Sequence, residues 1–226
     1  MSRETGRCGR RLGSPPPRWA LTLAGLLAGA LALVVGTAGC TNKGPSRAPV
    51  ADRPAGGPVT FVVMGDQRAT AGQTPDALHQ AWPQLMFTRS LPRRAVYVNL
   101  ASDGATVADA RRAQVGAAHD LKPTVVAVWL GKADSQQATS QDRFEARLGA
   151  LVDDLRRAAA DPGPPPATKL RVLLVAADPY VDAVKGAARD HDAEVVDVHG
   201  VDADSGDARS QQQVADAVSK VLGPQP

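Results

Sequence analysis

The sequence predicts an α/β domain over residues 59–226, built on a doubly wound, five-stranded parallel sheet with helices on both faces. Short apolar runs alternate along the chain with longer amphipathic segments, which is typical of repeated strand–helix units. The run at residues 124–130 is apolar throughout, as expected for a strand covered on both faces. Parallel strands need a long crossover, and right-handed crossovers distribute the helices over the two faces of the sheet.

The expected strands are short apolar runs, and the first of them stops abruptly at Gly65 and Asp66. The complete set is residues 61–64, 95–100, 124–130, 170–176 and 194–198. Residues between the first strand and Ala81 are small and polar, so a loop is expected there. Residues 162–166 are proline-rich and are expected to form a rigid connector.

Five helices are expected between and after these strands, at residues 81–91, 106–121, 141–160, 181–189 and 209–222. Pro83 suits the first turn of the first of them. Thr106 and Asp109 have the spacing of a capping box at the start of the second, which must end before Pro123. The third carries one apolar stripe, formed by Phe144, Leu148, Leu151, Val152 and Leu155.

Residues 1–39 have the pattern of a secretory signal peptide: a basic stretch, then an almost purely apolar run from Trp19 to Gly39. The run ends in Thr-Ala-Gly-Cys, which resembles the bacterial lipobox. That resemblance implies that Cys40 is lipidated and anchors an extracytoplasmic protein to the cell membrane. An uncleaved membrane anchor is the alternative, because the apolar run is just long enough to span a bilayer. Residues 40–58 are rich in Pro and Gly and predict a flexible tether.

Composition excludes several classes of function. Removing residues 1–39 lowers Lys+Arg from 26 to 21 and Asp+Glu from 23 to 22, so the net charge falls from +3 to −1. With so few aromatic residues and no basic stripe, no nucleic-acid partner is expected. Cys8 lies in the signal and Cys40 at the proposed lipid site, so no disulfide, metal site or cofactor is expected in the domain.

The segment Gly65-Asp66-Gln67 lies at the predicted carboxyl end of the first strand, the edge where open α/β sheets bind ligands. It resembles the first signature block of the SGNH (GDSL-type) hydrolases, in which Gly-Asp-Ser presents the nucleophilic serine. In this sequence Gln67 stands at the position of that serine. The resemblance implies a flavodoxin-like fold of the SGNH-hydrolase type.

Three further blocks resemble the same family, in order, from Val59 to about Leu222. Gly104 follows the second strand and matches the glycine of the second block. Gly-Lys-Ala-Asp follows the third strand and matches Gly-x-Asn-Asp, with Ala133 at the asparagine and Asp134 at the aspartate. Before the last helix, Asp202 and Ser205 fall on the aspartate and histidine of Asp-x-x-His.

The departures from the family fall on its chemistry. Gln67 is not a nucleophile and Ser205 is not a base near neutral pH, whereas acyl transfer needs both. Ala133 removes a donor from the expected oxyanion hole. The domain is therefore expected to have no catalytic residues and to bind an envelope glycan, lipid or protein partner. The expected ligand-binding residues are Gly65, Asp66, Gln67, Gly104, Asp134 and Asp202, whose polar groups suit hydroxyl-rich ligands.

Two alternatives remain open. One is an active esterase or acetylhydrolase with a relocated catalytic set, in which Ser102 or Ser135 is the nucleophile and His199 the base. The other is an interaction scaffold that uses a helix face. Each retained residue also has a purely structural interpretation: the glycines permit tight turns and the aspartates cap loops or helices.

Overall fold

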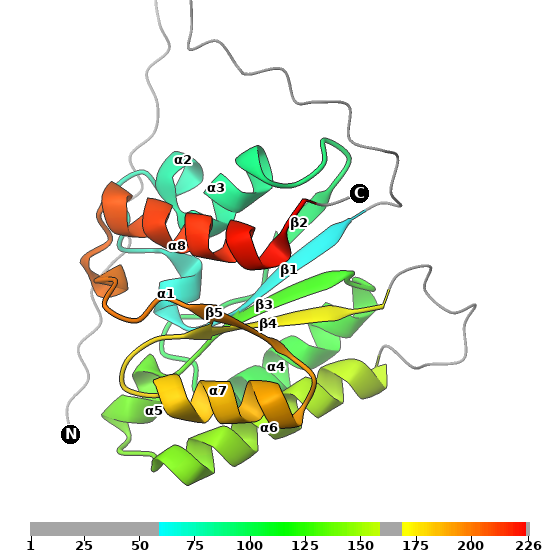
Figure 1. The fold of residues 1–226 in the computed structure, drawn as a ribbon, viewed down its shortest axis with the longest axis vertical. Helices are drawn as coiled ribbons and strands as arrows, with labels where there is room; N and C mark the ends of the chain where they lie inside the picture. The colour runs from blue at the N-terminus through cyan, green and yellow to red at the C-terminus, as the bar shows by residue number, and fades with distance from the viewer. Residues whose placement is uncertain (1–58, 159–168, 225–226) are drawn as a thin grey trace, which may run out of the picture. The chain divides into compact units, whose positions relative to one another are not determined.

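The computed structural model, which describes residues 59–158 and 169–224, contains one sheet of five parallel strands (Figure 1). The strands are β1 (Thr60–Gly65), β2 (Val96–Asn99), β3 (Val125–Trp129), β4 (Arg171–Ala176) and β5 (Glu194–Asp197). Their order across the sheet is β2-β1-β3-β4-β5, and every pairing is parallel. The predicted doubly wound α/β fold is confirmed, and each predicted strand is present within two residues of its expected bounds.

Helices cover both faces of this sheet (Figure 1). One face carries α3 (Trp82–Arg89) and α8 (Ala208–Leu222), and the other carries α4 (Val107–Asp120), α6 (Gln141–Ala158) and α7 (Val181–Asp190). Within β1, Val62 and Met64 pack towards α4, α6 and α7, whereas Phe61 and Val63 pack towards α3 and α8. Because strand side chains alternate between faces, a sheet buried on both sides needs uninterrupted apolar strands.

The segment after β1 differs from the prediction. The prediction of a polar loop there is wrong, because the segment contains two short helices, α1 (Gln67–Thr70) and α2 (Ala77–Gln80). The loop after β3 likewise begins with α5 (Lys132–Gln136), and a 3-10 turn, η1 (Ala203–Ser205), precedes α8. Helices of one turn carry no hydrophobic period, so the sequence pattern could not reveal them. The side chain that caps α1 is Asp66, which accepts a hydrogen bond from the Arg68 N–H.

The predicted helix starts and ends are close to those observed. The capping box at α4 is confirmed: Thr106 Oγ1 accepts from the Asp109 N–H at 3.2 Å, and the Asp109 carboxylate accepts from the Thr106 N–H at 3.1 Å. The predicted signal peptide, Cys40, the tether and the proline-rich connector lie outside the described residues. In the described ranges, no helix has the length and apolar character needed to cross a bilayer.

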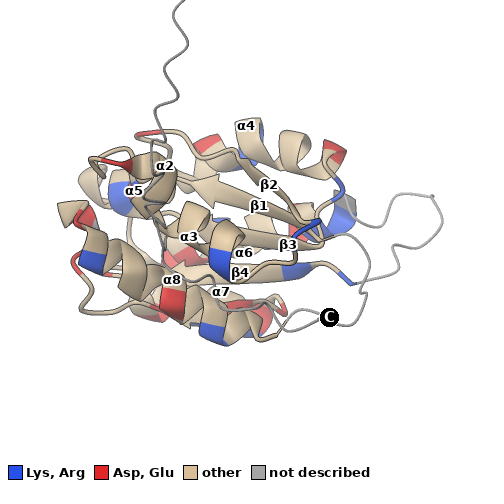
Figure 2. Cartoon of the chain, turned by 90° about the horizontal axis from the view of Figure 1, so that it is seen from above, with Lys and Arg blue, Asp and Glu red and all other residues tan. Residues whose placement is uncertain are grey.

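Charged residues of both signs are interspersed along the helices in the view of Figure 2. Several pair with each other, for example Arg111 with Asp154 at 2.6 Å and Lys185 with Asp197 at 2.9 Å. These pairs are partly exposed, so each contributes little to stability. The stability of the domain therefore rests on the two apolar layers that flank the sheet.

Candidate functional site

The carboxyl end of β1 lies unusually close to the end of β3. A Cβ atom built at Gly65 would lie 2.0 Å from the Trp129 carbonyl oxygen, and the φ of Gly65 is +148°. The next residue, Asp66, donates its N–H to that same carbonyl at 3.0 Å. Only glycine fits this close approach. The predicted structural role for Gly65 therefore agrees with the geometry.

The side chain of Gln114, on α4, makes two hydrogen bonds with the backbone of Gly65. Its side-chain oxygen accepts from the Gly65 N–H at 2.9 Å, and its side-chain nitrogen donates to the Gly65 carbonyl at 3.0 Å. Gln114 is buried, so this paired contact satisfies its carboxamide. No motif in the sequence marked Gln114 as part of the site. A lone glutamine on the buried face of an amphipathic helix was the signal available.

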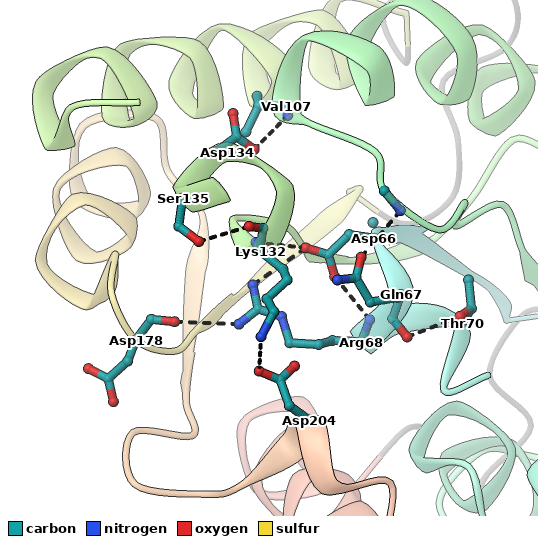
Figure 3. A network of polar contacts seen from close by, with 12 residues as sticks. Asp66, Gln67, Arg68, Thr70, Val107, Lys132, Asp134, Ser135, Asp178 and Asp204 are labelled. Atoms are coloured by element: carbon teal, nitrogen blue, oxygen red, sulfur yellow. Dashed lines mark hydrogen bonds and ion pairs between the residues drawn. The ribbon is translucent and has the colours of Figure 1, made fainter. Parts of the chain in front are cut away.

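The Asp66 carboxylate is completely buried and joins three parts of the site (Figure 3). Oδ1 accepts from the Arg68 N–H at 3.0 Å, which caps α1. Oδ2 accepts from the Lys132 N–H at 2.9 Å and lies 3.4 Å from Nη2 of Arg68. Asp66 thus ties the end of β1 to the start of α5, and its carboxylate faces protein groups rather than solvent.

Gln67 and Gly104, from two different sequence blocks, are brought together. The Gly104 N–H donates to Oε1 of Gln67 at 3.2 Å, and Gly104 has a φ of +73°. The Gln67 carbonyl accepts from the hydroxyl of Thr70, which lies 2.7 Å from the Asp103 carboxylate. The resemblance matches Gln67 to the family's serine and assigns the Gly104 N–H to the oxyanion hole. In this structure the Gln67 side chain therefore accepts the hydrogen bond that an oxyanion would accept.

Asp134 lies on α5 and is completely buried. Its Oδ2 accepts from the Val107 N–H at 3.0 Å, which fastens the start of α4 to α5, while Oδ1 has no hydrogen-bond partner among the described residues. Burial raises the pKa of the Asp134 carboxyl above its ordinary value, and the negative charge of Asp66 adds to the rise. Ala133, at the asparagine position, is buried and presents only a methyl group.

Asp202 and Ser205 belong to the exposed turn before α8. The Ser205 hydroxyl donates to the Asp202 carbonyl at 2.7 Å and also contacts the carboxylate of Asp207, the N-cap of α8. Hydrogen bonds from the Ser205 and Ser210 hydroxyls hold the pKa of Asp207 below its ordinary value. Ser205, which the resemblance matches to the family's histidine, therefore supports a helix cap in this structure.

The relocated catalytic pair is not assembled in this structure. Ser102 follows β2 and His199 follows β5, the two edge strands of the sheet, which are four strand spacings or about 19 Å apart. The Ser135 hydroxyl donates to the Lys132 carbonyl at 2.8 Å. His199 instead has Nδ1 at 3.1 Å from the carboxylate of Asp178, and no serine hydroxyl bonds to it within the described ranges.

Arg68 is a central residue of the site, although it belongs to none of the sequence blocks that resemble the family. It is 6% exposed, and its guanidinium lies 5.5 Å from the centre of a Trp129 ring. Nη1 donates to the Asp178 carbonyl at a long 3.5 Å (Figure 3). A basic residue immediately after the strand-end signature was the available signal. In the described part of the chain, no three His, Cys, Asp or Glu side chains are grouped as metal ligands.

Comparison with known proteins agrees with this geometry. A catalytic mutant of Axe2, an acetylxylan esterase from Geobacillus stearothermophilus, shares the fold at 17% identity and a TM-score of 0.60, over 76% of this chain and 97% of that one. The psychrotrophic esterase EstA from Pseudoalteromonas sp. is similar at 16% identity and a TM-score of 0.55, over 72% of this chain and 96% of that one. LAE5, an alpha/beta hydrolase enzyme from the metagenome of Lake Arreo, Spain, is similar at 19% identity and a TM-score of 0.57, over 73% of this chain and 96% of that one. No curated protein matches the chain. Residues 64–218 match the GDSL-like lipase/acylhydrolase family, and the chain therefore belongs to that family.

Proposed function

We propose that this protein is a non-catalytic member of the family, held outside the cytoplasm by a lipidated Cys40, and that the surface at the carboxyl ends of its strands binds a hydroxyl-rich glycan of the cell envelope. The observation that carries the proposal is the hydrogen bond from the Gly104 N–H to the side chain of Gln67. An acyl-transfer site needs that N–H for the developing oxyanion. Here a neutral amide of the protein itself occupies it.

The other catalytic positions support the same conclusion. Ala133 has no donor, and the Ser205 hydroxyl is committed to the turn before α8. A carboxamide, a methyl group and a hydroxyl in these three places supply neither a nucleophile activated by a base nor a full oxyanion hole. The scaffold residues Gly65 and Asp66 keep their positions because they hold β1, β3 and α5 together.

Binding of hydroxyl groups suits the polar side chains that remain accessible at this edge. Gln67 and Lys132 are half-buried, and Asp103 and Asp202 are exposed. Together they offer amide and ammonium donors and carboxylate acceptors, which match the dual character of sugar hydroxyls. Asp66 and Asp134 are buried, and in this proposal they shape the site while the accessible side chains contact the ligand.

The proposal predicts that triacetylchitotriose, a neutral saccharide probe, shifts the backbone amide signals of Gln67 and Gly104 in an NMR titration of residues 41–226. A Gln67→Ala variant should shift the Gly104 signal without ligand, because that N–H loses its internal acceptor. The amides of Arg157 and Ser219, on helix faces, serve as controls. Ligand-induced shifts confined to helix faces would favour the interaction-scaffold alternative.

Anchoring is a separate prediction. In the native host, Cys40→Ala should remove the protein from the membrane fraction or leave its signal uncleaved, because the thiol that accepts the lipid is absent. Cys8→Ala is the matched control, since Cys8 lies within the predicted signal. Fractionation and intact-mass measurement of the mature chain test both variants. A wild-type chain found free in the medium with an unmodified Cys40 would contradict the proposal.

A second candidate function is hydrolysis of acyl or acetyl esters with His199 as the base and Ser102 or Ser135 as the nucleophile. The observation in its favour is the contact between Nδ1 of His199 and the Asp178 carboxylate at 3.1 Å. A carboxylate in that position orients an imidazole and stabilises its protonated form. The serine would have to approach His199 through a rearrangement of the loops after the strands.

A further inference from the structure

The charged residues of the domain are unequally divided between the two ends of the strands, although both signs occur along the helices. Because all five strands are parallel, their starts share one edge with the last turns of the long helices (Figure 1). Ten Lys and Arg but only four Asp and Glu lie there, and several of the basic residues are visible at this edge in Figure 2. We call it the basic edge, and it consists of residues 86–95, 117–124, 155–158, 169–171, 187–194 and 219–224.

The opposite edge, where the strands end and the proposed ligand site lies, has the reverse composition. It carries twelve Asp and only four Lys and Arg, in residues 65–85, 99–110, 129–144, 176–184 and 197–211. The net charges of the two edges are therefore +6 and −8. The nearly neutral composition of the chain after residue 39 thus conceals two edges of opposite charge.

The helix dipole accounts for part of this separation. A helix carries a partial charge of about −0.5 at its carboxyl end, which favours basic side chains in its last turn. The ends of the five long helices therefore bring about −2.5 to the basic edge, less than half of the +6 from its side chains. Arg93, Arg94 and Lys122 lie beyond the ends of α3 and α4, in the segments that lead into β2 and β3. An excess of positive charge remains at this edge.

Ion pairs involve most acidic residues of the basic edge but leave several of its cations unpaired. Three acidic residues pair with basic ones: Asp190 with Arg189, Asp192 with Lys169 and Glu194 with Arg171. The fourth, Asp120, lies 4.0 Å from His119. Four exposed cations have no ion-pair partner in the described part of the chain: Arg93, Arg94, Lys122 and Lys220.

The unpaired cations come from neighbouring elements. β2, β1 and β3 begin in register, with β1 between the other two. Arg94 precedes β2 by two residues and Lys122 precedes β3 by three, and these strands are two spacings or about 10 Å apart. Nη2 of Arg171, at the start of β4, donates to the Val221 carbonyl at 3.0 Å. This bond brings the end of α8, which carries Lys220, beside β4.

The chain enters the described domain at the same edge. Val59 directly precedes β1, and its carbonyl accepts from the N–H of Val96, at the start of β2, at 2.8 Å. The predicted tether, residues 40–58, therefore joins the domain here, and a flexible coil of that length spans roughly 20–25 Å. A lipid anchor at Cys40 would bring the basic edge within about 25 Å of the bilayer surface.

We propose that the basic edge docks on a membrane surface rich in anionic phospholipid. The inference rests on the proposed anchoring through Cys40 and adds the orientation of the domain. Each Lys or Arg near such a surface strengthens binding about fivefold, whereas the acidic edge is repelled. The site with Gln67 and Gly104 therefore faces away from the membrane, towards the envelope. A soluble anionic polymer is the other partner that suits this charge, and the position of the tether favours the membrane.

Co-sedimentation of residues 41–226 with vesicles tests the docking without the lipid anchor. This chain contains every helix and strand of the described fold. It should bind vesicles of phosphatidylglycerol and phosphatidylcholine in equal parts, and it should not bind vesicles of phosphatidylcholine alone. Added salt should weaken the binding, because the Debye length falls from about 30 Å at 0.01 M to about 8 Å at 0.15 M. Equal binding to both kinds of vesicle, or binding to neither, overturns the proposal.

Charge variants locate the binding surface. The triple variant Arg93→Gln, Arg94→Gln, Lys122→Gln should bind anionic vesicles about 10- to 100-fold more weakly while its circular dichroism stays unchanged, because all three side chains are exposed. A control variant removes the same charge from exposed residues outside the basic edge and should leave binding nearly unchanged: Arg112→Gln, Arg143→Gln, Arg209→Gln. Equal losses in the two variants would mean that only net charge matters, which overturns the proposal.

Orientation is measured on the mature lipidated chain. Cys8 and Cys40 are its only cysteines, so a fluorophore can be attached at one introduced thiol. Ala117→Cys places it on the last turn of α4, at the basic edge, and Gln136→Cys places it on α5, at the opposite edge. Both positions are exposed. On anionic vesicles with a headgroup quencher, the label at position 117 should be quenched more strongly. Equal quenching at the two positions overturns the docking.

The outcomes separate this inference from the anchoring on which it rests. If Cys40 proves unmodified while residues 41–226 bind anionic vesicles, the docking stands and the anchor fails. If Cys40 is lipidated but the two labels are quenched equally, the anchor stands and the docking fails. Soluble polyphosphate is the remaining probe. If it binds through Arg93, Arg94 and Lys122 while anionic vesicles do not bind, the basic edge serves a soluble polymer and the membrane proposal is overturned.

Discussion

Replacing Asp66 by alanine should lower the free energy of unfolding of the domain by about 3–5 kcal/mol, the usual cost of removing one partner of a buried ion pair. The variant leaves Arg68 as an uncompensated buried charge. It also leaves the backbone N–H groups of Arg68 and Lys132 without the carboxylate that accepts their hydrogen bonds. At about 2–4 °C per kcal/mol for a domain of this size, the Tm should fall by about 10 °C.

Denaturant unfolding and thermal scans of the two proteins measure this effect. Asp66→Asn should cost less than alanine, because one amide oxygen can still accept from one of the two N–H groups. Asp202→Ala is the matched control, an exposed aspartate of the last signature block, and should change stability by less than about 0.5 kcal/mol. Equal free energies of unfolding for Asp66→Ala and wild type would show that Asp66 does not stabilise the fold.

The second large effect is on catalysis. The wild-type domain should hydrolyse short acyl esters no faster than an inert protein in the same buffer. The triple variant Gln67→Ser, Ala133→Asn, Ser205→His should exceed each single reversion by about 10²-fold or more, because catalytic groups acting as a unit are strongly non-additive. One restored oxyanion donor alone is worth about 10²–10³ in rate.

The structure explains why all three changes are needed. Gln67→Ser both supplies a nucleophile and frees the Gly104 N–H from its present acceptor. Ser205→His places an imidazole two residues before the N-cap of α8, with Asp202 three residues upstream to orient it. Ala133→Asn adds the missing amide donor. The absolute rate should stay below that of an evolved esterase, because a positioning error of about 1 Å can cost about 10² in rate.

The decisive measurement is wild-type turnover, read with variants at the competing site. Robust activity that survives Gln67→Ala and disappears in His199→Ala would falsify the non-catalytic proposal and support the relocated catalytic set. Ser102→Ala and Ser135→Ala would then identify the nucleophile. Asp178→Asn should reduce such activity as well, since that carboxylate contacts Nδ1 of His199.

The sequence by itself determined the fold class, every strand and the five long helices. These elements are set by local patterns: apolar runs, amphipathic periods, and caps such as that of Thr106 and Asp109. The prediction that Gln67, Ala133 and Ser205 depart from the family's catalytic types also came from the sequence alone, because it needs only residue identities at the positions that the resemblance matches.

Only the tertiary structure decided what the retained residues do. The sequence placed Asp66 and Asp134 at strand ends, but whether their carboxylates face solvent or protein depends on contacts with Lys132 and Val107, far away along the chain. The contact between Gln67 and Gly104, and that between Arg68 and the Asp178 carbonyl, likewise depend on loops that converge at one sheet edge. Side-chain burial and hydrogen-bond partners across the sheet are long-range properties, and a local pattern does not encode them.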